Sequence, residues 1–279
     1  MTKRELRKKD QIISPLIEQG QSPYHILANH PELDMSVRTL YSYLDQGLFT
    51  ARNIDLKRKV HFKPRKCHKT QITDRAVFSN RLYHDFCSLA LTDYVQMDTV
   101  HSSRESKKTL LTMFFTKEKL FLAFLMNRCT KGAVRLVFDR LEKRMGTYEF
   151  ASVFEYILTD RGSEFGDPDA LETGVNGIQR SSIYYCDPMQ SGQKGGLEQA
   201  HTMLRMILPK GTCFEFLTQW DINLIVNHIN STPRESLGGR TPYSVALETL
   251  GEEVLNAFQL RPIAPDEVNL TPKLIRFNH

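Results

Sequence analysis

The hydrophobic pattern changes along the chain, from helical near the N-terminus to strand-like in the middle and then to an alternation of both. The clearest N-terminal helix is expected over residues 36–46, between an N-cap at Ser36 and a C-terminal stop at Gly47. Two shorter helices are expected over residues 10–20 and 22–30. The apolar residues of the clearest helix follow the i, i+3, i+4, i+7 spacing of one face: Val37, Leu40, Tyr41 and Leu44.

The opposite face of this helix is polar and carries an arginine. Three short helices that end in such a face are typical of a helix-turn-helix, whose last helix enters the DNA major groove. A small helical bundle without any role in DNA binding has the same pattern, so both interpretations stay open. The candidate DNA contacts on this face are Arg38, Thr39 and Ser42.

From about residue 93 the chain becomes rich in β-branched, leucine and aromatic residues. Three short strands are expected there, followed by a helix over residues 131–146 and then by strands and helices in alternation. This order predicts an α/β fold of the ribonuclease-H-like (integrase) class, with an N-terminal all-α helix-turn-helix module. The expected strands cover residues 94–100, 109–116, 120–127, 154–159 and 182–186, and the later helices residues 195–208 and 218–230.

Length and composition are those of a two-domain soluble protein. The 279 residues are 41% hydrophobic and 25% charged, which excludes a disordered or low-complexity chain. No uncharged apolar stretch reaches 18 residues, the N-terminus lacks the apolar core of a signal peptide, and the five cysteines are scattered. We expect a cytoplasmic, nucleoid-associated bacterial protein. The predicted domains are a helix-turn-helix module (1–50), a basic linker (51–90), a catalytic core (91–250) and a C-terminal tail (251–279).

Positive charge is concentrated in the N-terminal quarter. Residues 1–70 carry 14 Lys and Arg against 7 Asp and Glu, whereas the whole chain has a net charge of +5. A basic run of this kind suits the DNA phosphate backbone, although a solvated linker has the same composition. The candidate phosphate contacts in it are Lys57, Arg58, Lys59, Lys63 and Arg65.

Three carboxylates stand at the ends or in the middle of predicted elements. Asp98 lies in the first strand, Asp160 ends the fourth strand, and Glu198 lies in the first turn of the helix over residues 195–208. A carboxylate on a half-buried strand is costly unless a cation compensates it, and carboxylate oxygens select Mg²⁺ or Mn²⁺. Two such ions about 4 Å apart catalyse phosphoryl transfer. The alternative is that the three residues are ordinary surface charges.

The sequence around these carboxylates resembles the insertion-sequence transposases of the IS30 type. The resemblance rests on six ordered segments that together with the N-terminal region cover nearly the whole chain. They are residues 95–100, 158–165, 185–189, 193–201, 204–212 and 227–242.

This resemblance implies a DDE recombinase with a retroviral-integrase-like core. Asp98, Asp160 and Glu198 would be the catalytic residues and would hold two Mg²⁺ or Mn²⁺ ions. The enzyme would cut the element's ends and join the 3′-hydroxyl to target DNA, with no covalent protein intermediate. Its partners would be double-stranded DNA, comprising the terminal inverted repeats and the target, and further copies of itself. Further candidates for DNA contacts beside the metals are Lys194, His201 and Arg205.

The chain departs from the family at three places and is expected to lack a further N-terminal helix-turn-helix. One of these places is just after Glu198, where Gln199 and Ala200 stand instead of the common Asn or Lys. Arg161 replaces the usual Asn and can pair with the neighbouring carboxylate in competition with a metal, and Gly192 replaces the usual Trp. One alternative is therefore a catalytically impaired, truncated remnant that only binds DNA. Another is a nuclease acting on RNA–DNA hybrids, which would not explain the N-terminal helices.

Four further residues carry smaller expectations. We expect His228 to be a hydrogen-bonded core histidine, Trp220 to be a core anchor, and Cys186 to serve packing. Glu164, four residues after Asp160, is a candidate for a carboxylate that contacts the metal ligands without binding the metal itself.

Overall fold

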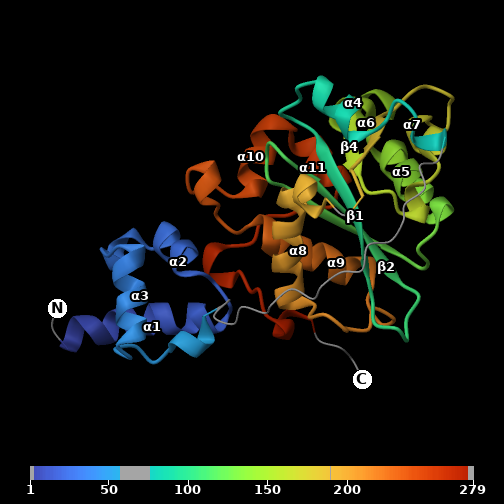
Figure 1. Cartoon of the computed structure of the whole chain (residues 1–279). Coiled ribbons are helices and arrows are strands. Elements are labelled where there is room, and N and C mark those ends of the chain that lie inside the picture. The colour runs from blue at the N-terminus through green and yellow to red at the C-terminus, as the bar shows by residue number, and fades with distance from the viewer. Residues whose placement is uncertain (1–2, 57–75, 189, 276–279) are drawn as a thin grey trace.

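The computed structural model describes residues 3–56, 76–188 and 190–275. In Figure 1 a group of N-terminal helices stands beside a larger α/β body. Each of the two has its own cluster of buried hydrophobic side chains. The candidate phosphate contacts Lys57, Arg58, Lys59, Lys63 and Arg65 lie outside the described residues.

The N-terminal group contains the three expected helices, with different starts. Ser36 Oγ accepts from Thr39 N at 3.1 Å, and Gly47 adopts a φ of +67° beyond the helix end, as the capping pattern predicted. Tyr41, which the pattern placed in the apolar stripe, is 43% exposed. The helices are α1 (Lys3–Glu18), α2 (Pro23–Asn29) and α3 (Val37–Asp45).

The α/β body is built on a five-stranded sheet with the order β3-β2-β1-β4-β5. The first three strands form an antiparallel meander, and β4 and β5 join the other side of β1 in parallel. Every residue of β2 is buried, so the sheet is covered on both faces. This strand order confirms the ribonuclease-H-like fold class. The strands are β1 (Val95–His101), β2 (Thr109–Phe115), β3 (Phe121–Met126), β4 (Tyr156–Thr159) and β5 (Ser182–Tyr185).

Helices pack around this sheet. One of them, α6, occupies the positions just before β4, so β4 starts later than the sequence predicts. The strand expected from residue 154 begins at Tyr156, because Phe154 ends α6 and its N–H donates to Phe150 O at 2.9 Å. The helices are α4 (Tyr83–Ser88), α5 (Lys131–Met145), α6 (Thr147–Val153), α7 (Pro168–Glu172), α8 (Gly195–Ile207), α9 (Gln219–Asn230), α10 (Pro242–Thr249) and α11 (Glu252–Ala257).

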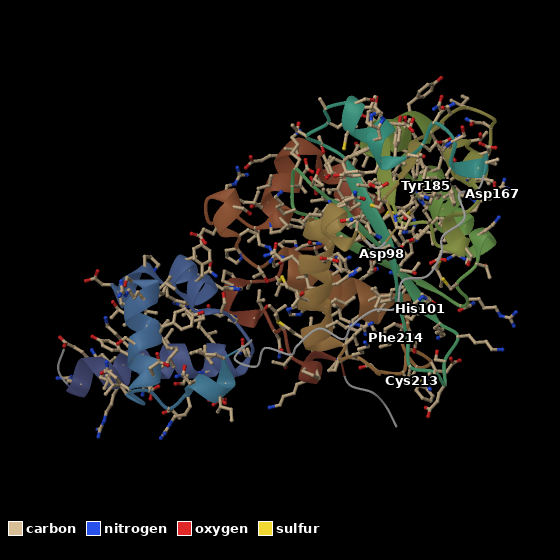
Figure 2. All side chains as sticks on the ribbon, viewed as in Figure 1. Asp98, His101, Asp167, Tyr185, Cys213 and Phe214 are labelled. Atoms are coloured by element: carbon tan, nitrogen blue, oxygen red, sulfur yellow. The ribbon has the colours of Figure 1, made fainter. Side chains whose placement is uncertain are left out.

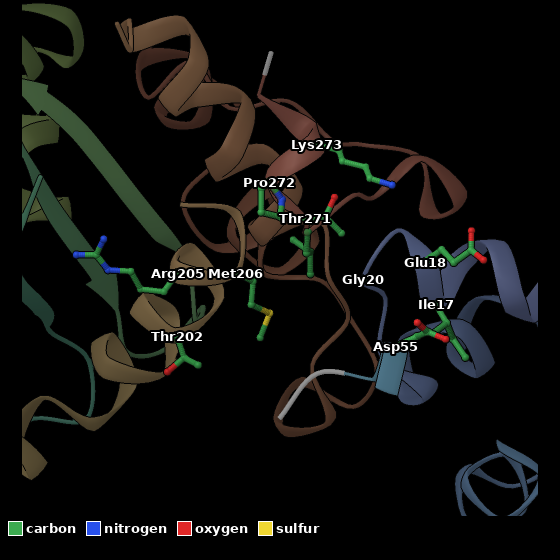
Figure 3. Close-up of a pocket in the computed structure, with 11 residues that line it drawn as sticks. Ile17, Glu18, Gly20, Asp55, Thr202, Arg205, Met206, Thr271, Pro272 and Lys273 are labelled. Atoms are coloured by element: carbon green, nitrogen blue, oxygen red, sulfur yellow. The ribbon is translucent and has the colours of Figure 1, made fainter. Parts of the chain in front are cut away.

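The C-terminal residues connect the two parts. Residues beyond 250 add Val254, Leu255 and Phe258 to the buried cluster of the α/β body. Gln21 Nε2 reaches from the N-terminal group to Pro265 O at 2.9 Å. Leu270 N donates to Gln19 O at 2.9 Å. A groove of about 610 Å³ lies where the N-terminal helices meet α8 and residues 270–273 (Figure 3). The domain boundaries stay a prediction.

Two single-residue expectations are decided by burial. His228 is 5% exposed and its Nδ1 accepts from Asn269 N at 3.0 Å, which confirms it as a hydrogen-bonded core histidine. The expectation for Trp220 is wrong, because this residue of the first turn of α9 is 71% exposed. None of the helices in the described ranges combines the length and the apolar character of a membrane span.

The burial of His228 predicts that acid destabilises the folded protein. Burial lowers its pKa from 6.5 to about 4. Its contribution to stability is therefore complete above pH 6.5 and is lost as the pH falls towards 4. In urea titrations between pH 7 and pH 5, His228→Gln should reduce the pH slope of the unfolding free energy by up to about 1.4 kcal/mol per pH unit. The control is His84→Gln, since the His84 side chain is 95% exposed. Equal slopes in His228→Gln and the unmodified protein would contradict this.

Candidate active site

The first candidate carboxylate lies on the face of the sheet that α8 covers. Asp98 is in β1, and side chains two residues apart on a strand share a face, so it points to the same side as Gln96. Gln96 is buried and its Oε1 accepts from Leu197 N of α8 at 2.9 Å. Asp98 Oδ1 accepts from Thr99 N at 2.7 Å. Figure 2 labels Asp98 and His101, which lie along β1.

The pairing of β1 with β4 brings the second carboxylate beside the first. These parallel strands pair Val95 with Ile157 and Gln96 with Leu158. Continuing the same register by two residues places Asp160, just beyond β4, next to Asp98. The register of the two parallel strands thus brings together two carboxylates that are far apart in the sequence.

A buried lysine lies between the two carboxylates. Lys194 Nζ is 3.0 Å from Asp98 Oδ2 and 3.6 Å from Asp160 Oδ2, and it donates to Met97 O at 3.3 Å. The residue is only 6% exposed. The resemblance to the transposases makes Lys194 a candidate DNA contact, and in this structure its ammonium is the counter-ion of both aspartates.

The surroundings of Asp160 disfavour the ionised form of its carboxyl group. Burial raises its pKa above the usual value, and the negative charges of Asp98 and Glu164 add to the rise. The Lys194 ammonium and the Gly162 N–H lower the pKa but do not outweigh the burial. A cation of higher charge beside Asp160 would favour the ionised form more strongly.

Close packing of α8 on the sheet positions Lys194 and the third carboxylate. A Cβ at Gly196 would lie 2.4 Å from Phe114 Cε1, so only glycine allows this approach. Glu198 follows Lys194 by four residues, which places the two on the same side of the helix start. Glu198 is exposed, whereas Asp98 and Asp160 are partly buried.

His201, a candidate DNA contact, is hydrogen-bonded into the sheet. Its Nε2 lies 2.8 Å from Thr112 Oγ1, and this hydroxyl donates to Asp98 O at 3.0 Å. Because the hydroxyl proton goes to the carbonyl, Nε2 donates to Thr112. Burial lowers the pKa of His201 to about 4. The ring therefore stabilises β1 and β2 beneath Asp98 as a neutral group.

Three of the four remaining DNA candidates in the described part of the chain also have hydrogen-bond partners within the protein. Arg205 donates to His101 O at 3.2 Å and Leu208 O at 3.4 Å. On α3, Thr39 Oγ1 lies 2.8 Å from Ser36 Oγ, and Ser42 Oγ accepts from Gln46 Nε2 at 3.0 Å. Arg38 is exposed. Their roles toward DNA stay predictions.

Arg161 extends toward the loop after β5. Its Nε donates to Cys186 O at 3.3 Å, a terminal nitrogen lies 3.9 Å from Asp187 Oδ1, and its guanidinium lies over the Phe78 ring. Cys186 is 4% exposed, in keeping with a packing role. Gly192 is exposed, and nothing would contact a Cβ there within 4 Å.

The donor set fits divalent cations. One nitrogen lies within 4 Å of both Asp98 and Asp160, so a single cation can reach oxygens of both. Carboxylate oxygens are the ligands that Mg²⁺ and Mn²⁺ prefer. Asp98 and Asp160 are thus the residues that could hold such an ion together, with Lys194 as a competing cation. Glu198, exposed in the first turn of α8, is the third candidate ligand.

Comparison with known proteins confirms the resemblance to IS30-type transposases. No family model matches the chain. The chain is 34% identical over 100 residues, 36% of its length, to the transposase for insertion sequence element IS1086 of Cupriavidus metallidurans. It is 32% identical over 88 residues, 31% of its length, to transposase InsI for insertion sequence element IS30A of Escherichia coli. These matches span only 28% and 21% of the two relatives.

A solved structure similar to the chain is the catalytic core domain of BIV integrase. It is 23% identical, with a TM-score of 0.40, and the match covers 57% of this chain and 96% of that domain. The strand order β3-β2-β1-β4-β5 defines the fold class independently of this similarity.

Removing the competing ammonium should change how the protein responds to metal. Lys194→Gln leaves Asp98 and Asp160 without their counter-ion, so in metal-free buffer we expect a loss of about 1–2 kcal/mol of stability. Mg²⁺ should stabilise this variant more than the unmodified protein, because the ion no longer displaces a lysine. A tenfold gain in affinity adds about 1.4 kcal/mol at saturating Mg²⁺.

The measurement is thermal unfolding with and without Mg²⁺. Lys117→Gln is the matched control, since Lys117 Nζ pairs with Asp93 at 3.4 Å away from the candidate site. An equal Mg²⁺ response in the two variants would rule out competition at Lys194.

Proposed function

We propose that the chain is a DDE transposase that cuts the ends of an insertion sequence and joins the 3′-hydroxyl to target DNA. The observation that carries this proposal is the convergence of Asp98 and Asp160 on one cation position, with Glu198 one helical turn from the lysine that lies there. The transposase relatives support the reaction class.

Each residue would have a distinct part in the reaction. Asp98, Asp160 and Glu198 would hold two Mg²⁺ or Mn²⁺ ions, which when bound activate the attacking oxygen and stabilise the leaving one. Lys194 would leave the two carboxylates when they take up cations, and its ammonium would then be available to a DNA phosphate. His201 would hold the strand beneath Asp98 through Thr112.

The N-terminal helices would bind the terminal inverted repeats. Their last helix, α3, exposes Arg38 in its first turn, and the N-terminal residues of a recognition helix are those that contact base edges. Cutting two ends of one element needs two active sites, so we propose that the chain acts as an oligomer on DNA.

Catalysis is tested by removing single carboxylate charges. Asp160→Asn and Glu198→Gln should each lower Mn²⁺-dependent nicking and strand transfer on an end-labelled duplex by at least about a hundredfold, because each loses a metal ligand. Asp169→Asn should cut normally, since the Asp169 side chain is 87% exposed on α7. Full cutting by Asp160→Asn would refute the DDE mechanism. DNA binding without cutting by the unmodified protein would favour the remnant.

DNA recognition is tested separately at Arg38. Arg38→Ala should weaken binding to the element's end by about 1–3 kcal/mol if the residue contacts a base, or lower the salt slope by about one if it contacts a phosphate. Arg135→Ala, which alters an exposed arginine of α5, is the control. Electrophoretic shifts at several salt concentrations measure both. If the DNA affinity and its salt slope are both unchanged, α3 is not part of the DNA interface.

A further inference from the structure

Three side chains with different metal-binding atoms converge beside the candidate active site. The ligand atoms of His101, Cys129 and Glu164 all lie within 4.8 Å of one another. They are separated by 28 and 35 positions in the sequence, so no local motif joins them. Only the fold brings them together.

Sheet topology explains the convergence. His101 is the last residue of β1, Cys129 follows β3 by three residues, and Glu164 lies in a short 3₁₀ helix (Ser163–Phe165) after β4. The three strands run in the same direction, because β1 is parallel to β4 and both β1 and β3 are antiparallel to β2. Their carboxyl ends therefore meet at one edge of the sheet.

The carboxylate of this cluster is buried among neutral partners. Glu164 is only 9% exposed, and its Oε1 accepts from Thr99 Oγ1 at 2.7 Å. The Cys129 thiol also hydrogen-bonds to Glu164. The donors to this carboxylate among the described residues are thus a hydroxyl and a thiol, and a buried carboxylate with neutral donors favours a nearby cation.

We propose that His101, Cys129 and Glu164 form a binding site for Zn²⁺ that is separate from the Asp98–Asp160 pair. Sulfur, imidazole nitrogen and carboxylate oxygen together are a ligand set that Zn²⁺ accepts, whereas Mg²⁺ avoids thiolate. Ligand atoms around a tetrahedral zinc lie about 3.5 Å apart. Any pair of these groups must therefore close by at most about 1.3 Å, and the exposed His101 side chain has the freedom to move.

Binding requires the thiol to ionise. Burial raises the pKa of Cys129 to about 11, and the Glu164 charge adds to the rise, so the thiol is neutral at pH 7 without a metal. Uptake of Zn²⁺ would release this proton to solvent and leave a thiolate on the metal. Three protein ligands leave a fourth position, which water fills.

The site would join the loops that surround the active site. Thr99, the hydroxyl partner of Glu164, is adjacent to Asp98. A Cβ at Gly162 would lie 2.7 Å from Glu164 Oε2 and 3.0 Å from Asp160 Oδ1, so these carboxylates flank one glycine. Zinc would thus fasten the ends of β1, β3 and β4 next to the catalytic pair. This role goes beyond the proposed function.

Cobalt substitution in the full chain tests the proposal without an activity assay. Co²⁺ added to reduced, metal-free protein should produce a thiolate-to-cobalt charge-transfer band that one equivalent of Zn²⁺ removes. Cys129→Ser should abolish the band, and His101→Ala should weaken Co²⁺ binding at least about tenfold. Circular dichroism of each variant shows whether it is folded.

Two controls separate this site from the active site. Cys186→Ser is the matched control, because Cys186 is a cysteine that follows β5 at the same edge of the sheet and is more buried than the half-buried Cys129. Asp160→Asn should retain the band even if it stops DNA cutting. Absence of the band in the unmodified protein, its survival in Cys129→Ser, or its loss in folded Cys186→Ser would overturn the proposal.

Discussion

The arrangement of the α/β body depends on a positive charge that compensates the negative charges of two neighbouring carboxylates at one edge of the sheet. Asp98 and Asp160 are brought together by the parallel pairing of β1 and β4, and their mutual repulsion must be offset by a cation. Lys194 supplies it at 3.0 Å and 3.6 Å. Because this lysine immediately precedes α8, the helix must dock where its first turn meets β1.

Several otherwise unrelated features follow from that docking. Gln96 is buried in order to receive the Leu197 N–H, and Gly196 lacks a side chain so that α8 can approach Phe114. One turn further, His201 reaches Thr112 on β2. The same helix therefore contacts both β1 and β2 and follows directly on Lys194, so the packing of α8 and the compensation of the two aspartates are coupled.

The regular elements could be predicted from sequence because their hydrophobic periods are local. The cap at Ser36, the three meander strands and the helices expected over residues 131–146 and 195–208 all depend on residues within a few positions of one another. Short helices such as α6 and α11 carry too few turns to show a period, and their stability comes from tertiary contacts. The exposure of Trp220 could not be predicted from the sequence, because it depends on which side of α9 faces the sheet.

The site could be predicted only in part, for the same physical reason. Asp98 and Asp160 could be singled out because each lies in or at the end of a predicted strand, within a segment that resembles the IS30-type transposases. The position of Lys194 between them is set by how α8 docks. The convergence of His101, Cys129 and Glu164 likewise needs the direction of three strands. Beyond the last ladder hydrogen bond of parallel strands, polar side chains can converge without interrupting the core. This explains why both groups of ligand atoms lie at this edge and why neither forms a contiguous motif.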